Sequence, residues 1–191
     1  MARRTEHEFK RDLNALLITE GISSLTIADI ATRLKCSKRR IYQIAPTKEA
    51  LFLEVCKTVL NESLERGYAK AQAETEPEKE ISAYLQATLN ASGMKKACFV
   101  DLDATVEGRK LFDDYQLARI RGLEEIIEKG VRQNVFSSTN PRLVSEAILG
   151  AAHRLRNQAL LAEMGVSIGD AFSEFYTLIL HGLLNTGQEK E

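Results

Sequence analysis

Two short helical patterns between residues 26 and 44 constrain the fold of this chain more than any other feature. The first begins at Thr26, whose hydroxyl group can cap the N-terminus of a helix. The second begins after Ser37, another capping residue, and must end near Pro46, because the residue before a proline avoids the helical conformation. A turn of only three or four residues separates the two patterns, and an amphipathic pattern at residues 9–17 precedes them. This order and spacing predict a helix-turn-helix.

The second of these helices carries an unusual charge. Its first turn reads Lys38-Arg39-Arg40, and cations in the first turn oppose the helix dipole at a cost of roughly 0.3–1 kcal/mol each. An anionic partner would offset this cost. In a helix-turn-helix, the N-terminal residues of the second helix are those that reach base edges in the major groove. Helical hairpins of this spacing also occur in proteins that never touch DNA, so the alternative is a solvated basic turn.

Charge is distributed unevenly along the chain. Ten Lys and Arg residues against five Asp and Glu residues give residues 1–48 a net charge of +5. The remaining 143 residues sum to −6, and the whole chain has a net charge of −1. A basic N-terminal segment followed by an acidic remainder suggests that one end of the chain meets a polyanion such as nucleic acid.

The rest of the sequence also has helical patterns, which predict an all-α fold of about nine helices. A pattern over residues 47–75 is roughly 29 residues long, enough for a helix of about 43 Å between an N-terminal head and a helical body. Further helical patterns follow from Pro77 onward. We therefore predict two domains: a three-helix helix-turn-helix domain at residues 1–48, and a helical ligand-binding and dimerisation domain at residues 49–191.

The last two helical patterns, at about residues 140–163 and 167–185, have broad apolar faces. Small residues that permit close helix approach lie in the first, at Ala147, Gly150, Ala151 and Ala159. Large apolar side chains dominate the second, at Phe172, Phe175, Tyr176, Ile179 and Leu183. These helices could cap their own domain or pair with a second copy of the chain in a four-helix bundle. We predict the homodimer, because two recognition helices must reach major grooves about 34–36 Å apart.

Other classes of protein find no support in the sequence. Cys36, Cys56 and Cys98 are an odd set without C-x-x-C spacing, which argues against a disulfide framework or a zinc site and favours a reducing compartment. No apolar run reaches the roughly 20 residues of a membrane span, and the N-terminus lacks a signal-peptide pattern, so we expect the cytoplasm. Catalytic motifs are missing, and the three histidines are scattered. We expect no enzyme, no metal and no cofactor.

The segment from Thr26 to Leu51 resembles the N-terminal domain of the tetracycline-repressor (TetR) family, and the resemblance is strong over residues 9–53. The positions that carry it are Thr26, Asp29-Ile30-Ala31, Ser37, Ile41-Tyr42, Lys48-Glu49 and Leu51. Beyond residue 55, only chain length and helix order agree. The resemblance implies a homodimeric regulator that binds double-stranded operator DNA. Its usual mode is that of a repressor released by a small-molecule effector.

The resemblance, carried over position by position, implies a DNA-binding surface made of Thr26, Ser37, Lys38, Arg39, Arg40, Tyr42, Gln43 and Lys48. Lys38, Arg39 and Arg40 would read bases and phosphates from the start of the recognition helix. Tyr42 and Gln43 would meet the DNA backbone or neighbouring bases. Thr26, at a helix N-terminus, and Lys48, with its ammonium group, would anchor phosphates on either side of the groove.

Three positions depart from the family pattern. Lys35 stands where the family usually has the turn glycine, and some backbone strain is expected there. Ile44 stands where the family often has a polar phosphate-contacting residue, a contact for which the two consecutive arginines could compensate. Ala45 replaces a large aromatic that plugs the space between the head and the long helix. The resemblance therefore does not determine the angle of the recognition helix.

Aromatic and polar residues of the helical body could line an effector pocket. They lie on helices expected to surround its centre, at Tyr84, Phe99, Phe112, Tyr115, Gln116 and His153. In the alternative interpretation, the aromatics are ordinary core, His153 lies at a subunit contact, and the nearby acids Asp101 and Asp103 are at the surface. These two acids diverge on a helix, so they make poor joint metal ligands.

The sequence favours a sequence-specific DNA-binding transcription regulator over two alternatives. A helical adaptor that binds only protein would keep the dimer helices but would leave the basic recognition turn unexplained. A regulator without a small-molecule effector would keep the DNA contacts and lose the pocket. Binding to heparin or non-specific DNA, with its dependence on salt, separates a DNA-binding regulator from the adaptor.

Overall fold

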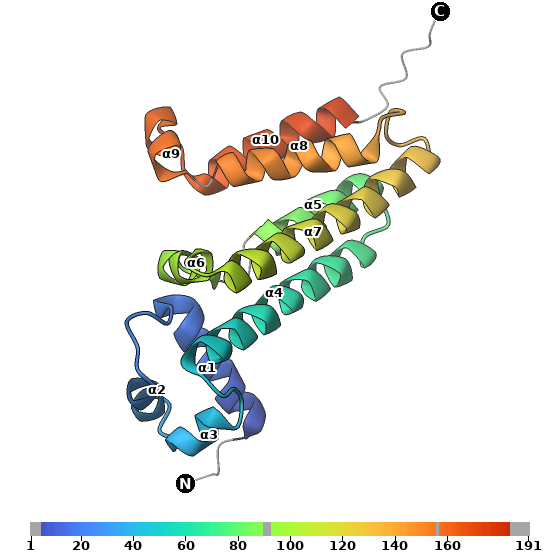
Figure 1. Cartoon of the computed structure of the whole chain (residues 1–191). Helices are drawn as coiled ribbons and strands as arrows, with labels where there is room; N and C mark the ends of the chain where they lie inside the picture. Colours follow the sequence, from blue (N-terminus) through green and yellow to red (C-terminus); the bar gives the residue numbers. More distant parts are fainter. Residues whose placement is uncertain (1–4, 90–92, 156, 184–191) are drawn as a thin grey trace, which may run out of the picture. The chain divides into compact units, whose positions relative to one another are not determined.

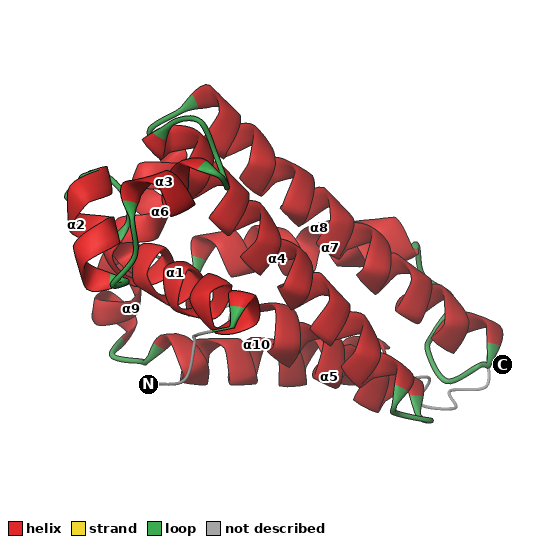
Figure 2. Cartoon of the chain, turned by 90° about the horizontal axis from the view of Figure 1, so that it is seen from below, coloured by secondary structure: helices red, strands yellow, loops and turns green. Residues whose placement is uncertain are grey.

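The computed structural model describes residues 5–89, 93–155 and 157–183, and in these ranges it consists of helices joined by loops and turns (Figures 1 and 2). The helices are α1 (Glu6–Glu20), α2 (Ile27–Arg33), α3 (Lys38–Tyr42), α4 (Lys48–Gln72), α5 (Pro77–Leu89), α6 (Lys96–Asp103), α7 (Val106–Arg132), α8 (Pro141–Arg154), α9 (Gln158–Met164) and α10 (Ile168–Leu183). The predicted all-α class is confirmed. None of the described helices has the length and apolarity to cross a membrane.

Contacts within the chain divide it into two compact units. Unit 1 comprises residues 1–63 and 90–115, and unit 2 comprises residues 64–89 and 116–191. Helices α4 and α7 each contribute to both units. This division by contacts does not test the predicted functional boundary after residue 48, which stays a prediction.

Side-chain caps determine where the first helices begin. Thr5 and Glu8 form a capping box at the start of α1. The same arrangement recurs at α2, where the Asp29 amide donates to Thr26 Oγ1 at 3.2 Å and the Thr26 amide donates to Asp29 Oδ2 at 2.9 Å. At α3, the amide of Arg40 donates to Ser37 Oγ at 3.2 Å. Both caps that the sequence predicts for the helix-turn-helix are therefore present.

The N-terminal head, which is α1 to α3 with the start of α4, has its own apolar core. Its members are almost fully buried: Phe9, Leu13, Leu17, Ile30, Ile41, Ala45 and Leu51. In the turn between α2 and α3, Lys35 has φ = 49°, the left-handed conformation that favours glycine. The strain expected at this departure from the family pattern is thus located in the backbone.

Helix α6 packs against α1 and α4 within unit 1. The Lys95 amide, just before α6, donates to the carbonyl of Ile18 at 2.8 Å. Cys98 on α6 lies with its Sγ 3.8 Å from Sγ of Cys56 on α4, and both thiols are buried and free. The pKa of Cys56 is raised, mainly by the contact with Cys98 and to a lesser extent by burial, so this thiol stays protonated.

The core of unit 2 gathers around Tyr84, Ile127, Phe136 and Ile148. A predicted single helix over residues 140–163 was wrong, because the structure has α8 and α9 there. Asn157 begins α9, since its Oδ1 accepts from the amides of Ala159 at 3.0 Å and Leu160 at 3.2 Å. The apolar pattern runs through this break and does not signal it. Ser167 caps α10, because its Oγ accepts from the Asp170 amide at 3.2 Å.

Candidate DNA-binding interface

Helix α3 and the residues that follow it have two different faces. Arg40, Ile41, Ile44 and Ala45 form an inner face, in which Ile41 and Ala45 are buried and the other two half-buried. Lys38, Arg39, Tyr42 and Gln43 form an outer face and are all exposed. The two sets interleave at spacings of one, three and four residues, as the helical period requires. The apolar inner positions therefore determine which side of α3 is presented to solvent.

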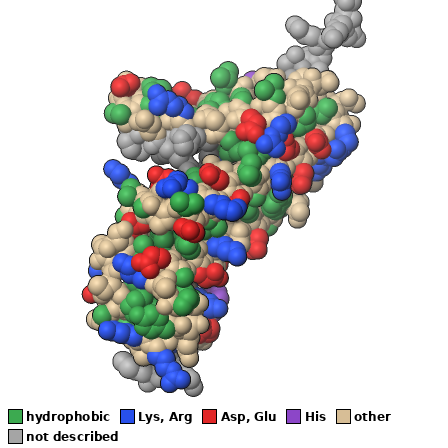
Figure 3. Space-filling model, viewed as in Figure 1, with side chains coloured by type: hydrophobic (Ala, Val, Ile, Leu, Met, Phe, Trp, Pro, Cys, Tyr) green, Lys and Arg blue, Asp and Glu red, His purple; other side chains and the backbone are tan. Residues whose placement is uncertain are grey.

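The outer face combines two cations, a phenol and an amide. Tyr42 is 52% exposed, so its hydroxyl group is accessible from solvent. Arginine and lysine donate to guanine edges and phosphates, glutamine recognises adenine, and tyrosine donates to phosphate oxygens. Figure 3 shows basic side chains on the surface over the part of unit 1 that holds α1 to α3. The outer face has the donor groups that a major-groove reader needs.

Arg40 is engaged with α1 rather than with solvent. Its Nη2 lies 2.9 Å from Oε2 of Glu6, and its Cζ lies 4.0 Å from the centroid of the Phe9 ring. Only 34% of its side chain is exposed. The sequence predicts base or phosphate contact for all three consecutive cations, and the structure separates Arg40 from the other two.

Lys48 and Thr26 have partners within the head. The Lys48 ammonium is half-buried and donates to the carbonyls of Ile22 at 3.2 Å and Leu25 at 3.0 Å. The exposed Thr26 hydroxyl donates to Asp29 Oδ2 at 2.6 Å. The pKa of Asp29 is lowered, mainly by this hydrogen bond and to a lesser extent by the one from the Thr26 amide. The predicted phosphate contacts of both residues stay predictions.

Asp101 on α6 is a residue whose role the sequence did not indicate. Its carboxylate accepts from the amides of Ile22 and Ser23, the latter at 2.9 Å, and from the Ser23 hydroxyl. Partial burial alone would raise the pKa of Asp101, but the hydrogen bonds from Ser23 and Ile22, together with the Lys48 charge, lower it. A Cβ at Gly21 would collide with Asp101 Oδ2, so glycine permits this approach.

Asp101 and Lys48 together hold the segment that leads into α2. Asp101 binds its amides, and Lys48 binds its carbonyls, so the backbone over residues 21–25 is held by both of its polar groups. These contacts join residues 23 to 79 positions apart in the sequence. No local pattern could reveal them. We call this arrangement the loop clamp.

Residues 14–55 match the family model of the bacterial regulatory proteins of the tetR family. The matched residues contain α2, α3 and the turn between them. Residues 14–55 therefore form an N-terminal domain of the TetR-family type. Regulators of that family are DNA-binding proteins rather than enzymes.

Solved structures of transcriptional regulators share this fold. A putative transcriptional regulator from Saccharomonospora viridis in complex with choline has a TM-score of 0.77 and 17% identity, over 94% of this chain and 100% of that chain. FadR from Bacillus subtilis in complex with stearoyl-CoA has a TM-score of 0.71 and 13% identity, over 93% of this chain and 99% of that chain. The TetR family regulator PfmR from Thermus thermophilus has a TM-score of 0.65 and 20% identity, over 93% of this chain and 99% of that chain. Such identities establish the fold alone. A comparison with curated proteins finds no match.

Three of the predicted effector-contacting residues lie together in unit 1. Phe99 and Phe112 are half-buried and meet edge to face, with ring centroids 5.7 Å apart. Tyr115 is buried 6.1 Å from Phe112, centroid to centroid, and its hydroxyl donates to Ser63 Oγ at 3.2 Å. These residues therefore form a continuous aromatic cluster, and their contact with an effector stays a prediction.

Two further predicted residues lie in unit 2, around a buried arginine. The Tyr84 hydroxyl donates to the carbonyl of Arg119 at 3.1 Å, and Gln116 Oε1 accepts from Arg119 Nη1 at 2.8 Å. Arg119 is 2% exposed, and the sequence did not single it out. The side chain of His153 lies outside the described residues. A surface pocket of about 360 Å³ in unit 2 is lined by none of the predicted effector residues; its lining is Glu78, Lys79, Ser82, Thr177, Leu180 and His181.

Proposed function

We propose that this chain regulates transcription by placing the outer face of α3 in the major groove of operator DNA. The observation that carries the proposal is the exposure of Lys38, Arg39, Tyr42 and Gln43 on a helix whose other side is packed into the head. Because the inner face is fixed, the four outer side chains are presented as one surface. Ser37 and Thr26, exposed at the starts of α3 and α2, would bind the flanking phosphates.

The proposed regulator acts as a homodimer through α8 and α10. Leu143, Ala147 and Gly150 are exposed and lie four and three residues apart, on one face of α8. On α10, Leu178 is 70% exposed. Exposed leucines beside small residues suit close packing against a second copy. A two-fold axis through these helices would supply the pair of recognition helices that a symmetric operator needs.

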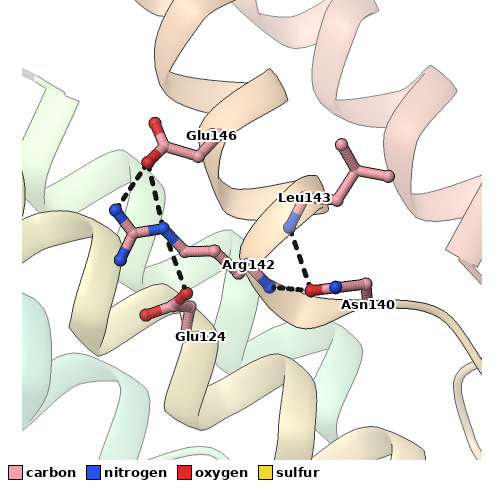
Figure 4. Close-up of polar contacts among 5 residues, drawn as sticks. All are labelled: Glu124, Asn140, Arg142, Leu143 and Glu146. Carbon is pink, nitrogen blue, oxygen red and sulfur yellow. Dashed lines mark hydrogen bonds and ion pairs between the residues drawn. The ribbon is translucent and has the colours of Figure 1, made fainter.

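Polar contacts at the start of α8 support this choice of surface (Figure 4). Arg142 lies 3.4 Å from Glu124 of α7 and 2.6 Å from Glu146 of α8, and Asn140 Oδ1 accepts from the amides of Arg142 and Leu143. The Arg142–Glu124 ion pair joins α8 to α7 within unit 2, and the other contacts lie within residues 140–146. Leu143 remains 67% exposed, so its side chain is available to another protomer.

We further propose that a small, largely apolar effector binds within residues 50–180 and releases the DNA. Support comes from the aromatic cluster of Phe99, Phe112 and Tyr115, and from the ligands in two similar structures. Those ligands are choline and stearoyl-CoA, which differ so much in chemistry that neither identifies an effector here. Release requires reciprocity: operator DNA must weaken effector binding by the same factor. The proposed function places the protein in the cytoplasm, with its operator.

Selection of binding sites from random double-stranded DNA tests the proposal. The expected product is a palindromic site whose half-sites are one helical turn, or a multiple of it, apart. Recovery of asymmetric sites would contradict the dimer, and recovery of no common sequence would contradict the DNA-binding regulator. Binding to protein without binding to heparin or DNA would favour the alternative, a helical adaptor. A thermal-shift screen followed by DNA-release titration tests the effector: ligands that stabilise the fold yet leave DNA affinity unchanged would contradict release.

A further inference from the structure

The three consecutive cations of α3 are not equivalent. Lys38 and Arg39 belong to the exposed outer face, whereas Arg40 precedes the fully buried Ile41 on the inner face. One residue corresponds to about 100° of rotation around a helix, so Arg40 points toward α1 when Arg39 points toward solvent. The same basic run therefore has two structural environments.

Arg40 contacts α1 at two points. Its guanidinium lies over the Phe9 ring, 4.0 Å from the centroid, and donates to the Glu6 carboxylate at 2.9 Å. Glu6 and Phe9 are three residues apart, on one face of α1. A planar guanidinium can stack on a ring and donate at its edge simultaneously, which a lysine cannot do.

Both partners of Arg40, Phe9 and Glu6, occupy positions that are favourable without Arg40. The Phe9 ring is 0% exposed and belongs to the core of the head. Glu6 lies in the first turn of α1, where a negative charge is favoured by the helix dipole. To reach DNA, Arg40 would have to leave both contacts and expose the face of a core aromatic. Arg39 would have to leave neither of them.

We propose that Arg40 is a positioning residue that fixes α3 against α1, and that Arg39 is the arginine of this helix that discriminates bases. This assignment rests on the proposed function and divides a role that the sequence gives to both arginines. Arg40 sets the orientation of the outer face through the α1 contact. Its charge is balanced by Glu6, so Lys38 and Arg39 supply the positive charge that the outer face presents.

The test compares the full-length protein with Arg39→Ala, Arg40→Ala and Glu6→Gln variants on the selected operator and all its single-base variants. Arg39→Ala should lower the preference at one base pair of each half-site, by roughly 5- to 150-fold, because a bidentate contact is lost. Arg40→Ala should weaken binding to every sequence by a similar factor and leave the preference profile unchanged. A merely structural role for Arg39 would not alter that profile.

Glu6→Gln separates the two possible roles of Arg40 by the sign of its effect. If Arg40 positions α3, the loss of its partner should weaken operator binding. If Arg40 reads DNA, Glu6 competes with DNA for it, and Glu6→Gln should strengthen binding. Asp12→Asn is the matched control, because it removes one negative charge from α1 without touching the Arg40 contacts. Its effect on affinity is subtracted from that of Glu6→Gln.

A second measurement judges the α3–α1 contact without DNA. Amide hydrogen exchange at Ile41, Tyr42 and Gln43 should be faster in Arg40→Ala than in Arg39→Ala. Glu6→Gln should add little in the Arg40→Ala background, since both substitutions disrupt one contact. Unchanged exchange, or a base-specific loss in Arg40→Ala as large as that in Arg39→Ala, would overturn the assignment. If the wild type selects no sequence, the proposed function fails, whereas the exchange rates still judge whether Arg40 positions α3.

Discussion

The N-terminal head and the C-terminal helices differ in whether contacts within one protomer satisfy their side chains. In unit 1, Lys48 and Arg40 of the head, and Asp101 of α6, each join segments that are distant in sequence. In α8 and α10, Leu143 and Leu178 face outward and are 67% and 70% exposed. The head thus obtains its geometry from contacts within one protomer. The C-terminal helices leave apolar side chains exposed, which the proposed second protomer would cover.

Leu178→Glu tests the C-terminal side of this comparison and should have the largest effect. A carboxylate in an apolar interface is costly, so the variant should sediment as a monomer at micromolar concentration. Operator affinity should fall by at least about 100-fold, because one head reads only one half-site. Val106→Glu is a matched control, since Val106 is 68% exposed in unit 1. A dimeric Leu178→Glu variant with unchanged operator affinity would contradict the interface.

Ile179→Glu sharpens the same point. The large apolar residues that the sequence assigns to the dimer face include Ile179, yet this side chain is half-buried against the core of unit 2. A charge there should destabilise the protomer itself, by about 1–3 kcal/mol, in addition to any effect on dimerisation. Urea unfolding followed by circular dichroism should separate it from Leu178→Glu, which should leave the protomer stable. Equal stabilities would show that Ile179 is no part of the core.

Asp101→Asn breaks the head side of the comparison at the loop clamp. Hydrogen bonds to a charged group contribute roughly 1.5–3 kcal/mol, so the free energy of unfolding at pH 7 should fall by about that amount. The folded-state pKa of Asp101 lies below its ordinary value of 3.8. Its stabilisation is therefore fully present above pH 3.8 and is lost as the pH falls through the lowered pKa. Urea titrations of wild type and variant should converge toward acid pH; a difference independent of pH would contradict the ionic contact.

Lys48→Met separates two roles of one lysine. Loss of its bonds to the Ile22 and Leu25 carbonyls should lower the free energy of unfolding by about 1–2 kcal/mol. If Lys48 also binds phosphate, the variant should weaken binding to all sequences about equally. The slope of log affinity against log salt should then fall by roughly 1. An unchanged slope with reduced stability would confine Lys48 to the loop clamp.

Lys35→Gly should have the smallest effect and the opposite sign. Lys35 has φ = 49°, so glycine relieves strain there and should raise the free energy of unfolding by about 0.5–1 kcal/mol. Asn134→Gly is the control, because Asn134 has a similar φ of 56° but asparagine tolerates this conformation better. Thermal unfolding of both variants checks the order. A larger gain in stability from Asn134→Gly than from Lys35→Gly would show that backbone strain at Lys35 does not account for the stabilisation.

Local chemistry explains which parts of the fold the sequence could predict. Thr26, Ser37 and Ser167 each cap a helix whose N-terminus follows directly, so the signal and the structure lie within three residues. The two faces of α3 could also have been separated, because buried Ile41 fixes the helical phase and puts Arg40 on the inner side. The family resemblance assigns one role to all three cations, whereas the helical phase distinguishes Arg40 from Lys38 and Arg39.

Contacts between distant segments explain what the sequence could not show. Asp101 and Ile22 are 79 residues apart, and an aspartate on an amphipathic helix is indistinguishable from an ordinary surface acid. Arg119 is a similar case: its burial depends on how α7 packs, and arginine is usually exposed. The break between α8 and α9 is local instead: apolar positions continue at helical spacing on both sides of Asn157 and hide the capping role of this residue.

The position of Asp101 has a consequence for protein engineering. A graft that exchanges only residues 1–48 between regulators would leave the amides of Ile22 and Ser23 facing a foreign α6, without the carboxylate that accepts from them here. The exchangeable module is therefore discontinuous: it includes α6 along with the first three helices. Chimeras that carry both segments should keep the donor's operator preference and affinity. Grafts of residues 1–48 without α6 should bind the operator more weakly while keeping its preference for the same bases.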